Sequence, residues 1–159
     1  MPGNTCCFIG HRDINETEQL KSSLIGIIEK MILNENVDTF LFGSKSDFNS
    51  LCLDIVTETK EKYPNIKRVY VRSQYPCVEG DYLDYLLTFY DDTYYPERIK
   101  RAGKSVYVER NYEMIDNSRF CVFYYKPKNI LATRKSGTKI AYEYAVKNKK
   151  EIFILPKEI

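Results

Sequence analysis

The chain has 159 residues, with 24 Lys and Arg, 22 Asp and Glu and one His, so its net charge is only +2. This length suits one domain, because compact domains most often contain about 100–150 residues. A hydrophobic fraction of 43% excludes a disordered chain. The pI of about 8.2 weighs against long nucleic acid as a partner, since nucleic-acid-binding domains usually have a pI above about 9.

No segment of the sequence has the roughly 20 consecutive apolar residues that cross a bilayer. The N-terminus also lacks the basic segment followed by an apolar stretch that is typical of a secretory signal. We therefore expect a cytoplasmic protein without a membrane partner.

The sequence contains five cysteines but no Cys-x-x-Cys pair, and its single histidine, His11, has no partner at metal-binding spacing. We expect no metal site and no cofactor. Cys77 lies in a polar segment, whereas the other four lie in apolar segments and are expected to be buried, reduced thiols. These four are Cys6, Cys7, Cys52 and Cys121.

The first part of the chain alternates apolar runs with helical patterns. Residues 5–9 form a short apolar run closed by Gly10, which predicts a buried strand. Apolar residues at helical spacing from Leu20 to Leu33 predict a helix that stops within residues 34–36. A second buried strand is predicted at 39–42, and a second helix from about Ser46 to Tyr63, ahead of a proline.

The pattern then resumes around an irregular segment. A third strand is predicted at 69–71, followed by a Tyr-rich insertion at about 73–104 that contains a short helix near 82–89. A helix at 108–116, a strand at 120–124, a helix at 138–147 and a strand at 152–155 complete the chain. Strands that alternate with helices indicate parallel pairing with right-handed crossovers. The prediction is therefore an α/β protein, a single three-layer Rossmann-like domain over 1–159 with a mainly parallel five-stranded sheet.

Three polar loops leave the predicted strands at the carboxyl edge of the sheet, where ligands bind in such folds. They follow the first strand at 10–12, follow the second at 43–46, and open the helix after the fourth at 136–138. Each loop can offer backbone N–H groups to a phosphate, although glycines also simply end strands. Cationic side chains add positive charge to the same rim: Arg12, Lys45, Arg134 and Lys135.

Three short sequence motifs resemble those of a known family: FIGHR at 8–12, NYEMIDNS at 111–118 and SGT at 136–138. With them the chain resembles, over nearly its whole length, the YpsA-like branch of the SLOG superfamily. These are Rossmann-like proteins related to the cytokinin-activating LOG enzymes and to the DNA-uptake protein DprA. The resemblance implies a pocket for a nucleotide-derived ligand, formed by the loops after the first, second and fourth strands. The predicted ligand-binding residues are Gly10, His11, Arg12, Gly43, Ser44, Lys45, Asn111, Asn117, Arg134, Ser136, Gly137 and Thr138.

The sequence also departs from the LOG pattern. LOG enzymes carry a Gly-Gly-x-Gly-Thr-x-x-Glu motif whose glutamate works in cleavage of an N-glycosidic bond. Ala141 stands at the matching position, three residues after Thr138, and the second loop at 43–49 lacks the family's Gly-Gly-Ala-x-Gly-x-Asp pattern. The resemblance therefore implies nucleotide binding without LOG-type hydrolysis.

Three carboxylates are candidates for a catalytic role: Glu109, Asp116 and Glu143. A carboxylate of the 109–117 cluster would bind a ribose hydroxyl or attack a ribosyl carbon. The structural alternative, which we favour, is that Asn117 caps the helix and Asp116 forms a salt bridge. Glu143 lies in a different helical register from the missing glutamate.

Three functions follow from these patterns. The first is a module that senses or sequesters a phosphate-bearing nucleotide signal, such as those used in antiviral defence, and works as a homo-oligomer. The second is an N-glycosidic-bond hydrolase or ribosyltransferase that acts on nucleotides. The third is a protein-interaction subunit whose Tyr-rich insertion docks a partner, because tyrosines stack on a nucleobase or pack an interface equally well.

Overall fold

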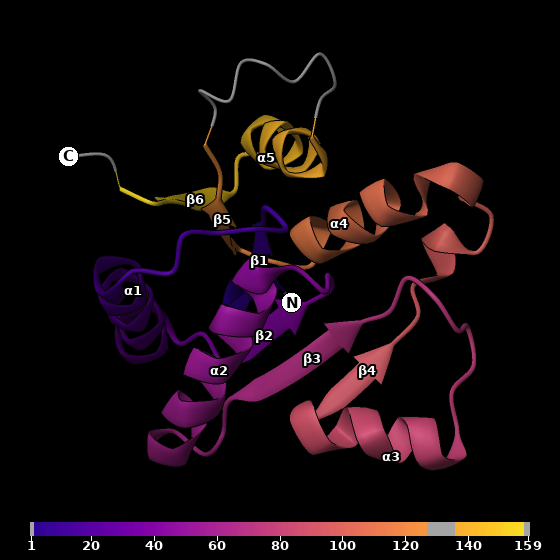
Figure 1. The fold of residues 1–159 in the computed structure, drawn as a ribbon, viewed down its shortest axis with the longest axis horizontal. Helices are drawn as coiled ribbons and strands as arrows, with labels where there is room; N and C mark the ends of the chain where they lie inside the picture. The colour runs from indigo at the N-terminus through magenta and orange to yellow at the C-terminus, as the bar shows by residue number, and fades with distance from the viewer. Residues whose placement is uncertain (1, 127–135, 158–159) are drawn as a thin grey trace.

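A computed structural model describes residues 2–126 and 136–157 of the chain. Its strands form one sheet in the order β4-β3-β2-β1-β5-β6, and every neighbouring pair is parallel (Figure 1). The α/β Rossmann-like fold is confirmed. The strands are β1 (Thr5–Gly10), β2 (Thr39–Phe42), β3 (Lys67–Val71), β4 (Asp92–Tyr94), β5 (Phe120–Tyr124) and β6 (Glu151–Leu155).

Each predicted helix is present with ends within two residues of the expected positions. Serine or threonine side chains fix three of the starts, because Thr17, Ser46 and Ser136 each accept a hydrogen bond from a backbone N–H in the first turn. The helices are α1 (Glu18–Glu35), α2 (Asp47–Lys62), α3 (Gly80–Phe89), α4 (Val106–Asp116) and α5 (Gly137–Lys147), with short 3₁₀ turns at Pro2–Asn4, Glu97–Ile99 and Gly103–Ser105.

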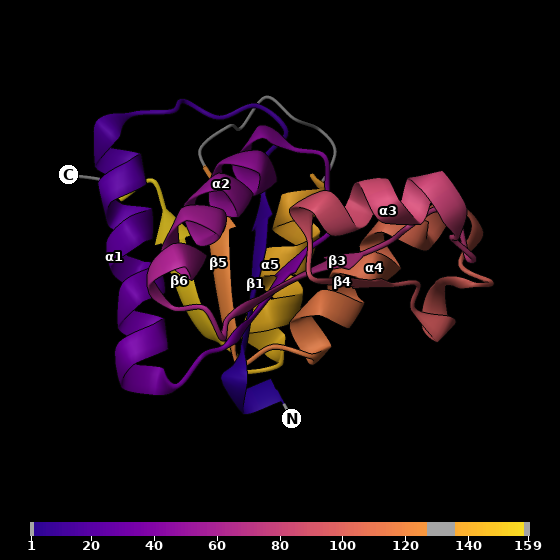
Figure 2. The same cartoon turned by 90° about the horizontal axis from the view of Figure 1, so that it is seen from below.

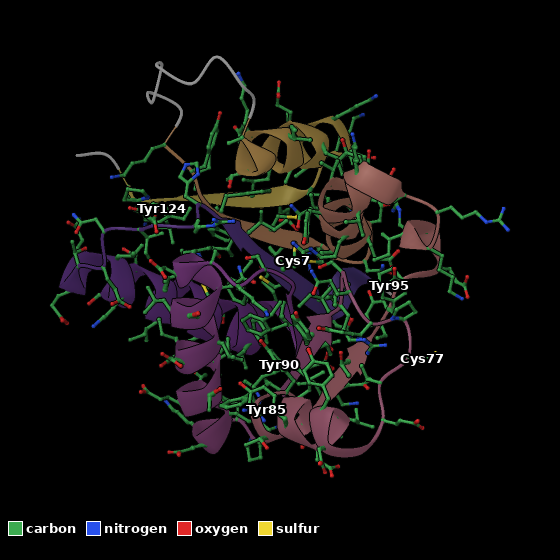
Figure 3. All side chains as sticks on the ribbon, turned by 45° about the vertical axis from the view of Figure 1, so that its right-hand side comes forward. Cys7, Cys77, Tyr85, Tyr90, Tyr95 and Tyr124 are labelled. Atoms are coloured by element: carbon green, nitrogen blue, oxygen red, sulfur yellow. The ribbon has the colours of Figure 1, made fainter. Side chains whose placement is uncertain are left out.

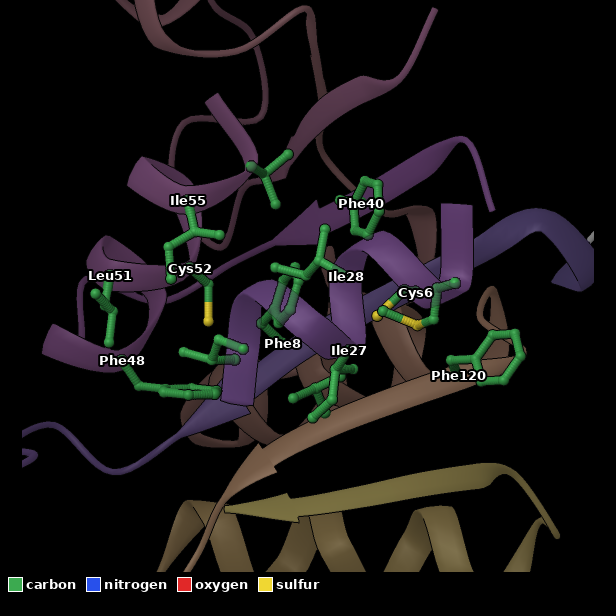
Figure 4. Packing of buried hydrophobic residues seen from close by; sticks show 14 of the residues in the cluster. Cys6, Phe8, Ile27, Ile28, Phe40, Phe48, Leu51, Cys52, Ile55 and Phe120 are labelled. Atoms are coloured by element: carbon green, nitrogen blue, oxygen red, sulfur yellow. The ribbon is translucent and has the colours of Figure 1, made fainter. Parts of the chain in front are cut away.

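Two hydrophobic clusters hold helices to the two faces of the sheet. In the first, Phe8 and Phe40 of the strands pack beneath α1 and α2, together with Ile28 and Phe48 of those helices (Figure 4). In the second, Cys7 and neighbouring strand residues pack against α4 and α5 on the opposite face. Because successive residues of a strand point to opposite faces, both faces of β1 are buried, and this explains its continuous apolar sequence.

The sheet has six strands, so the prediction of five was wrong by one. The additional strand is β4, a three-residue edge strand that lies inside the Tyr-rich segment. Its sequence, Asp92-Thr93-Tyr94, is too short and too polar to show strand periodicity. It forms because β3 offers a free edge: Arg72 donates its N–H to the Tyr94 carbonyl at 2.8 Å, and the Thr93 hydroxyl donates to the Tyr70 carbonyl at 2.8 Å.

The strand order also locates the crevice where a ligand would lie. The chain moves from β1 outward to β4 and then returns to place β5 on the other side of β1. The order therefore reverses between β1 and β5, whose carboxyl ends point to the same edge (Figure 2). None of the described helices is long and apolar enough to cross a membrane.

The cysteines behave as predicted, since Cys6, Cys7, Cys52 and Cys121 are buried and Cys77 is exposed on an outer loop (Figure 3). Burial raises the pKa of the Cys6 and Cys52 thiols well above the usual value. We therefore expect one thiol to react rapidly with a disulfide reagent in the native protein and all five to react in denaturant. Rapid reaction of a second thiol in the native protein, or retention of a fast thiol in Cys77→Ser, would contradict this burial.

Candidate ligand-binding site

A cavity of about 650 Å³ opens at the carboxyl edge of the sheet. The three predicted loops line it, together with one side of α4 and the segment after β3. Arg134 and the adjacent Lys135 lie outside the described residues. Of the described residues predicted to bind the ligand, all except Asn117 line the cavity: Gly10, His11, Arg12, Gly43, Ser44, Lys45, Asn111, Ser136, Gly137 and Thr138.

The first loop contributes a neutral histidine. The Nε2 atom of His11 accepts a hydrogen bond from the Lys126 N–H at 3.1 Å, so the ring proton belongs on Nδ1. Burial and the nearby Lys126 charge lower the pKa of His11 below its ordinary 6.5. His11 is therefore uncharged at pH 7 and offers a ligand a hydrogen bond, while the exposed Arg12 beside it supplies charge.

In the second loop, a buried asparagine side chain already accepts the hydrogen bonds of two backbone N–H groups. Asn49 Oδ1 accepts from the N–H groups of Gly43 and Ser44, at 3.1 and 3.3 Å, and Asn49 Nδ2 donates to the Phe8 carbonyl at 3.0 Å. These two amides are therefore not free for a phosphate. The contribution of this loop to the cavity is its side chains, including the exposed ammonium group of Lys45.

The third loop leaves its helix terminus open. Ser136 caps α5 by accepting the Lys139 N–H at 3.0 Å, but the N–H groups of Gly137 and Thr138 donate to no described residue. A Cβ atom placed on Gly137 would meet nothing within 4 Å. Two donors without an acceptor among the described residues, at the positive end of a helix dipole, are a favourable environment for an anion.

The most heavily buried charge in the cavity belongs to Arg110 of α4, which belongs to the polar cluster at 109–117 but was not among the predicted ligand-binding residues. Its side chain is only 4% exposed. One terminal nitrogen, Nη1, donates to the Gly43 carbonyl, and Nε donates to Asn111 Oδ1 at 3.1 Å. Burial lowers the pKa of Arg110 to about 10, so the guanidinium remains charged at pH 7.

Arg110 has no carboxylate partner among the described residues. Its second terminal nitrogen, Nη2, donates to no described residue, yet no described side-chain polar atom is both fully buried and unpaired. Nη2 therefore reaches accessible space, which for this residue is the cavity. A buried cation without a counterion is costly, and an anionic ligand would compensate it.

Tyrosines form the wall of the cavity nearest β3: Tyr70, Tyr75, Tyr82 and Tyr107. The Tyr75 and Tyr82 rings meet edge to face with centroids 5.3 Å apart, and Tyr70 stacks on Tyr90 at 5.0 Å. Tyr75 and Tyr107 remain more than half exposed. The Arg110 guanidinium lies over the Tyr107 ring, 5.8 Å from its centroid. Exposed tyrosine rings can stack on a planar group, so we call this set of four the tyrosine wall.

A second buried arginine holds one residue of the tyrosine wall, Tyr75, in place. Arg72 Nε donates to the Tyr75 carbonyl at 3.0 Å, and its terminal nitrogens donate to the Pro76 carbonyl at 3.3 Å and to Thr93 Oγ1 at 3.0 Å. All three contacts lie within the segment predicted as a Tyr-rich insertion. Arg72 thereby fixes the loop after β3 against β4 and positions Tyr75 at the cavity.

The carboxylate candidates lie outside the cavity. Arg98 pairs with Glu109 at 3.2 Å and with Asp116 at 2.6 Å, and Asp116 also accepts a hydrogen bond from the Tyr144 hydroxyl at 2.8 Å. Asn117 ends α4 and donates to the Glu113 carbonyl at 2.9 Å. Asp116 therefore forms a salt bridge and Asn117 caps the helix, as the structural alternative to a catalytic role predicted.

The other catalytic candidate, Glu143, is exposed on α5 and does not line the cavity. Ala141, at the position of the LOG glutamate, is buried in the second core cluster. No carboxylate lines the cavity among the described residues, and the sequence between them, 127–135, contains no Asp or Glu. Within the described part of the chain, no three His, Cys, Asp or Glu side chains gather as metal ligands would.

Comparison with known protein families finds no family that matches the chain. A search of curated proteins likewise finds no match.

Proposed function

We propose that this protein binds a phosphate-bearing nucleotide or nucleotide-derived signal at the carboxyl edge of its sheet, and that it senses or sequesters the ligand without cleaving it. The observation that carries this proposal is the buried Arg110, which is charged and has no carboxylate partner among the described residues, in a cavity whose described lining has no acidic side chain. A phosphate supplies the missing negative charge, because it accepts charge-assisted hydrogen bonds from arginine and from a helix terminus.

The tyrosine wall supports a nucleotide over a simple phosphate ester. Aromatic rings stack on nucleobases of any identity, and stacking contributes about 1–3 kcal/mol per base. The cavity volume of about 650 Å³ lies within the usual range for small-molecule sites, about 300–1,000 Å³. The resemblance to the YpsA-like branch of the SLOG superfamily points to the same class of ligand.

Cleavage of an N-glycosidic bond is less well supported. That reaction commonly uses a carboxylate as nucleophile or proton donor at the sugar. The candidates Glu109 and Asp116 are paired with Arg98 outside the cavity, and Ala141 replaces the glutamate of the LOG motif. Binding without turnover is therefore the function that the arrangement of charges supports best.

Calorimetric titration with nucleoside mono-, di- and triphosphates, dinucleotides and cyclic nucleotides tests the proposal. We expect at least one compound to bind, and Gly137→Ala to weaken its binding by tenfold or more because the methyl group stands beside the two open amides. Gly26→Ala in α1 is the matched control, since a Cβ there also meets nothing within 4 Å. Both variants should fold, and the control should bind like the wild type.

Absence of heat across the whole panel would overturn the proposal. Equal binding by wild type and Gly137→Ala would overturn the role of the α5 N-terminus in binding, whereas the role of Arg110 is tested by its own substitution. Release of free base during the titration, detected by chromatography, would favour the hydrolase instead.

A further inference from the structure

We propose that the ligand carries a phosphate chain of at least two groups, with the inner phosphate on Arg110 and an outer phosphate on the N-terminus of α5. This inference rests on the proposed function and deepens it. It comes from the order in which the sheet arranges the binding groups along its edge.

The strand order fixes that arrangement. Tyr70 lies on β3 and Tyr75 follows it, so these two residues of the tyrosine wall stand at the β3 end of the edge, while Tyr107 of α4 lies against Arg110. Arg110 is bonded to the Gly43 carbonyl, directly after β2. The open amides of Gly137 and Thr138 begin the helix that leads from β5 to β6. Along the edge β3-β2-β1-β5, the aromatic wall, the buried arginine and the helix terminus therefore follow one another in that order.

The strand spacing sets the scale of the separation along this edge. Neighbouring strands lie about 4.8 Å apart, so β3 and β5, three steps apart, are separated by about 14 Å. In a nucleoside monophosphate, one sugar ring separates the base from its only phosphate. Such a ligand reaches from the tyrosine wall to Arg110 at the neighbouring strand, and a longer phosphate chain is needed to continue toward α5.

Separate observations identify the inner and the outer position for a phosphate. At the inner position, Arg110 is 4% exposed and its Nη2 atom, which donates to no described residue, reaches the cavity. At the outer position, Gly137 and Thr138 present N–H groups without described acceptors, and the exposed Arg12 also lines the cavity. Two separate positions for negative charge, with no acidic residue in the described lining, fit a chain of phosphates better than a single one.

The test compares AMP with ADP, and GMP with GDP, by calorimetry on the full chain. We expect the diphosphate to bind at least tenfold tighter than its monophosphate. Arg110→Gln should weaken both members of a pair, because both place a phosphate on Arg110. Gly137→Ala should weaken the diphosphate at least fivefold more than the monophosphate, and Gly26→Ala should change neither.

The outcomes separate this inference from the proposed function. If mono- and diphosphate bind equally to the wild type, the phosphate-chain inference fails while nucleotide binding stands. If no compound of the wider panel binds, both fail. If Gly137→Ala lowers both affinities by the same factor, the outer phosphate is not at α5, and the inference is overturned. The ratio of diphosphate to monophosphate affinity, measured on the wild type alone, decides the first outcome. The inference can therefore be tested even if a variant does not fold.

Discussion

Replacement of Arg110 by glutamine is expected to weaken binding of the nucleotide ligand by about 30-fold to 1,000-fold, or about 2–4 kcal/mol. The guanidinium is the most buried charge of the cavity and has no described carboxylate partner, so its full charge is available to the ligand. Calorimetric titration of wild type and variant with the tightest-binding compound measures the loss.

The same substitution should leave the protein folded. Glutamine can still donate a hydrogen bond toward the Gly43 carbonyl, and removing a buried, uncompensated charge also removes its desolvation cost. We expect the urea midpoint of Arg110→Gln to equal or exceed that of the wild type. Arg110→Lys is the matched variant that keeps charge but loses the planar donor geometry, and it should retain part of the affinity. Unchanged binding by Arg110→Gln would contradict the role of this side chain.

The second large effect is expected on stability, from Gly10→Ala. A Cβ atom on Gly10 would lie 2.4, 2.6 and 2.8 Å from Cδ2, Cγ and Cβ of Phe48. Phe48 is fully buried in the first core cluster and cannot move aside. We expect a loss of about 3 kcal/mol in the free energy of unfolding, and a fall in Tm of about 6–12 °C. Urea and thermal denaturation measure both quantities.

A double substitution identifies the cause. Phe48→Leu removes the atoms that the new methyl group would strike, so Gly10→Ala should cost at least about 1 kcal/mol less in the Phe48→Leu background than in the wild type. Gly26→Ala, in open space on α1, should not destabilise the protein. Strictly additive losses from Gly10→Ala and Phe48→Leu would show that their contact does not determine the need for glycine.

The fold was largely predictable because the sheet is buried on both faces. In β1, Cys6 and Phe8 face α1 and α2, whereas Cys7 and Ile9 face α4 and α5. A strand buried in this way has a continuous apolar sequence that stands out between polar segments. β4 was missed because its three polar or half-buried residues pair with β3, an interaction between distant parts of the chain that leaves no local pattern.

The three loops of the candidate site were predictable because each follows a recognisable strand. The role of each glycine in these loops was not predictable. Gly10 and Gly43 are required by protein atoms, Phe48 in one case and the Arg110 and Met114 side chains in the other, whereas only Gly137 of these three faces open space. Sequence cannot distinguish a close contact with a ligand from a close contact with another helix.

Arg110 could not be selected from sequence as a site residue, because its role depends on the side of α4 from which its side chain projects. Glu109 and Arg110 are neighbours in the chain, yet Glu109 pairs with Arg98 outside the cavity and Arg110 points to the loop after β2. The one available signal was position, since Arg110 lies one turn before the apolar Met114 and shares its buried side of α4. The position of Tyr75 in the tyrosine wall depends on Arg72 and β4, which only the folded structure brings together.

Mass spectrometry of small molecules released by denaturing the purified protein tests the central claim most directly, with Arg110→Gln purified in parallel. We expect an intact, phosphate-bearing nucleotide compound to be released from the wild type and to be strongly depleted from the variant. Equal amounts of the same compounds from both proteins, or no phosphate-bearing compound from the wild type under conditions that preserve bound ligand, would contradict nucleotide capture by this cavity.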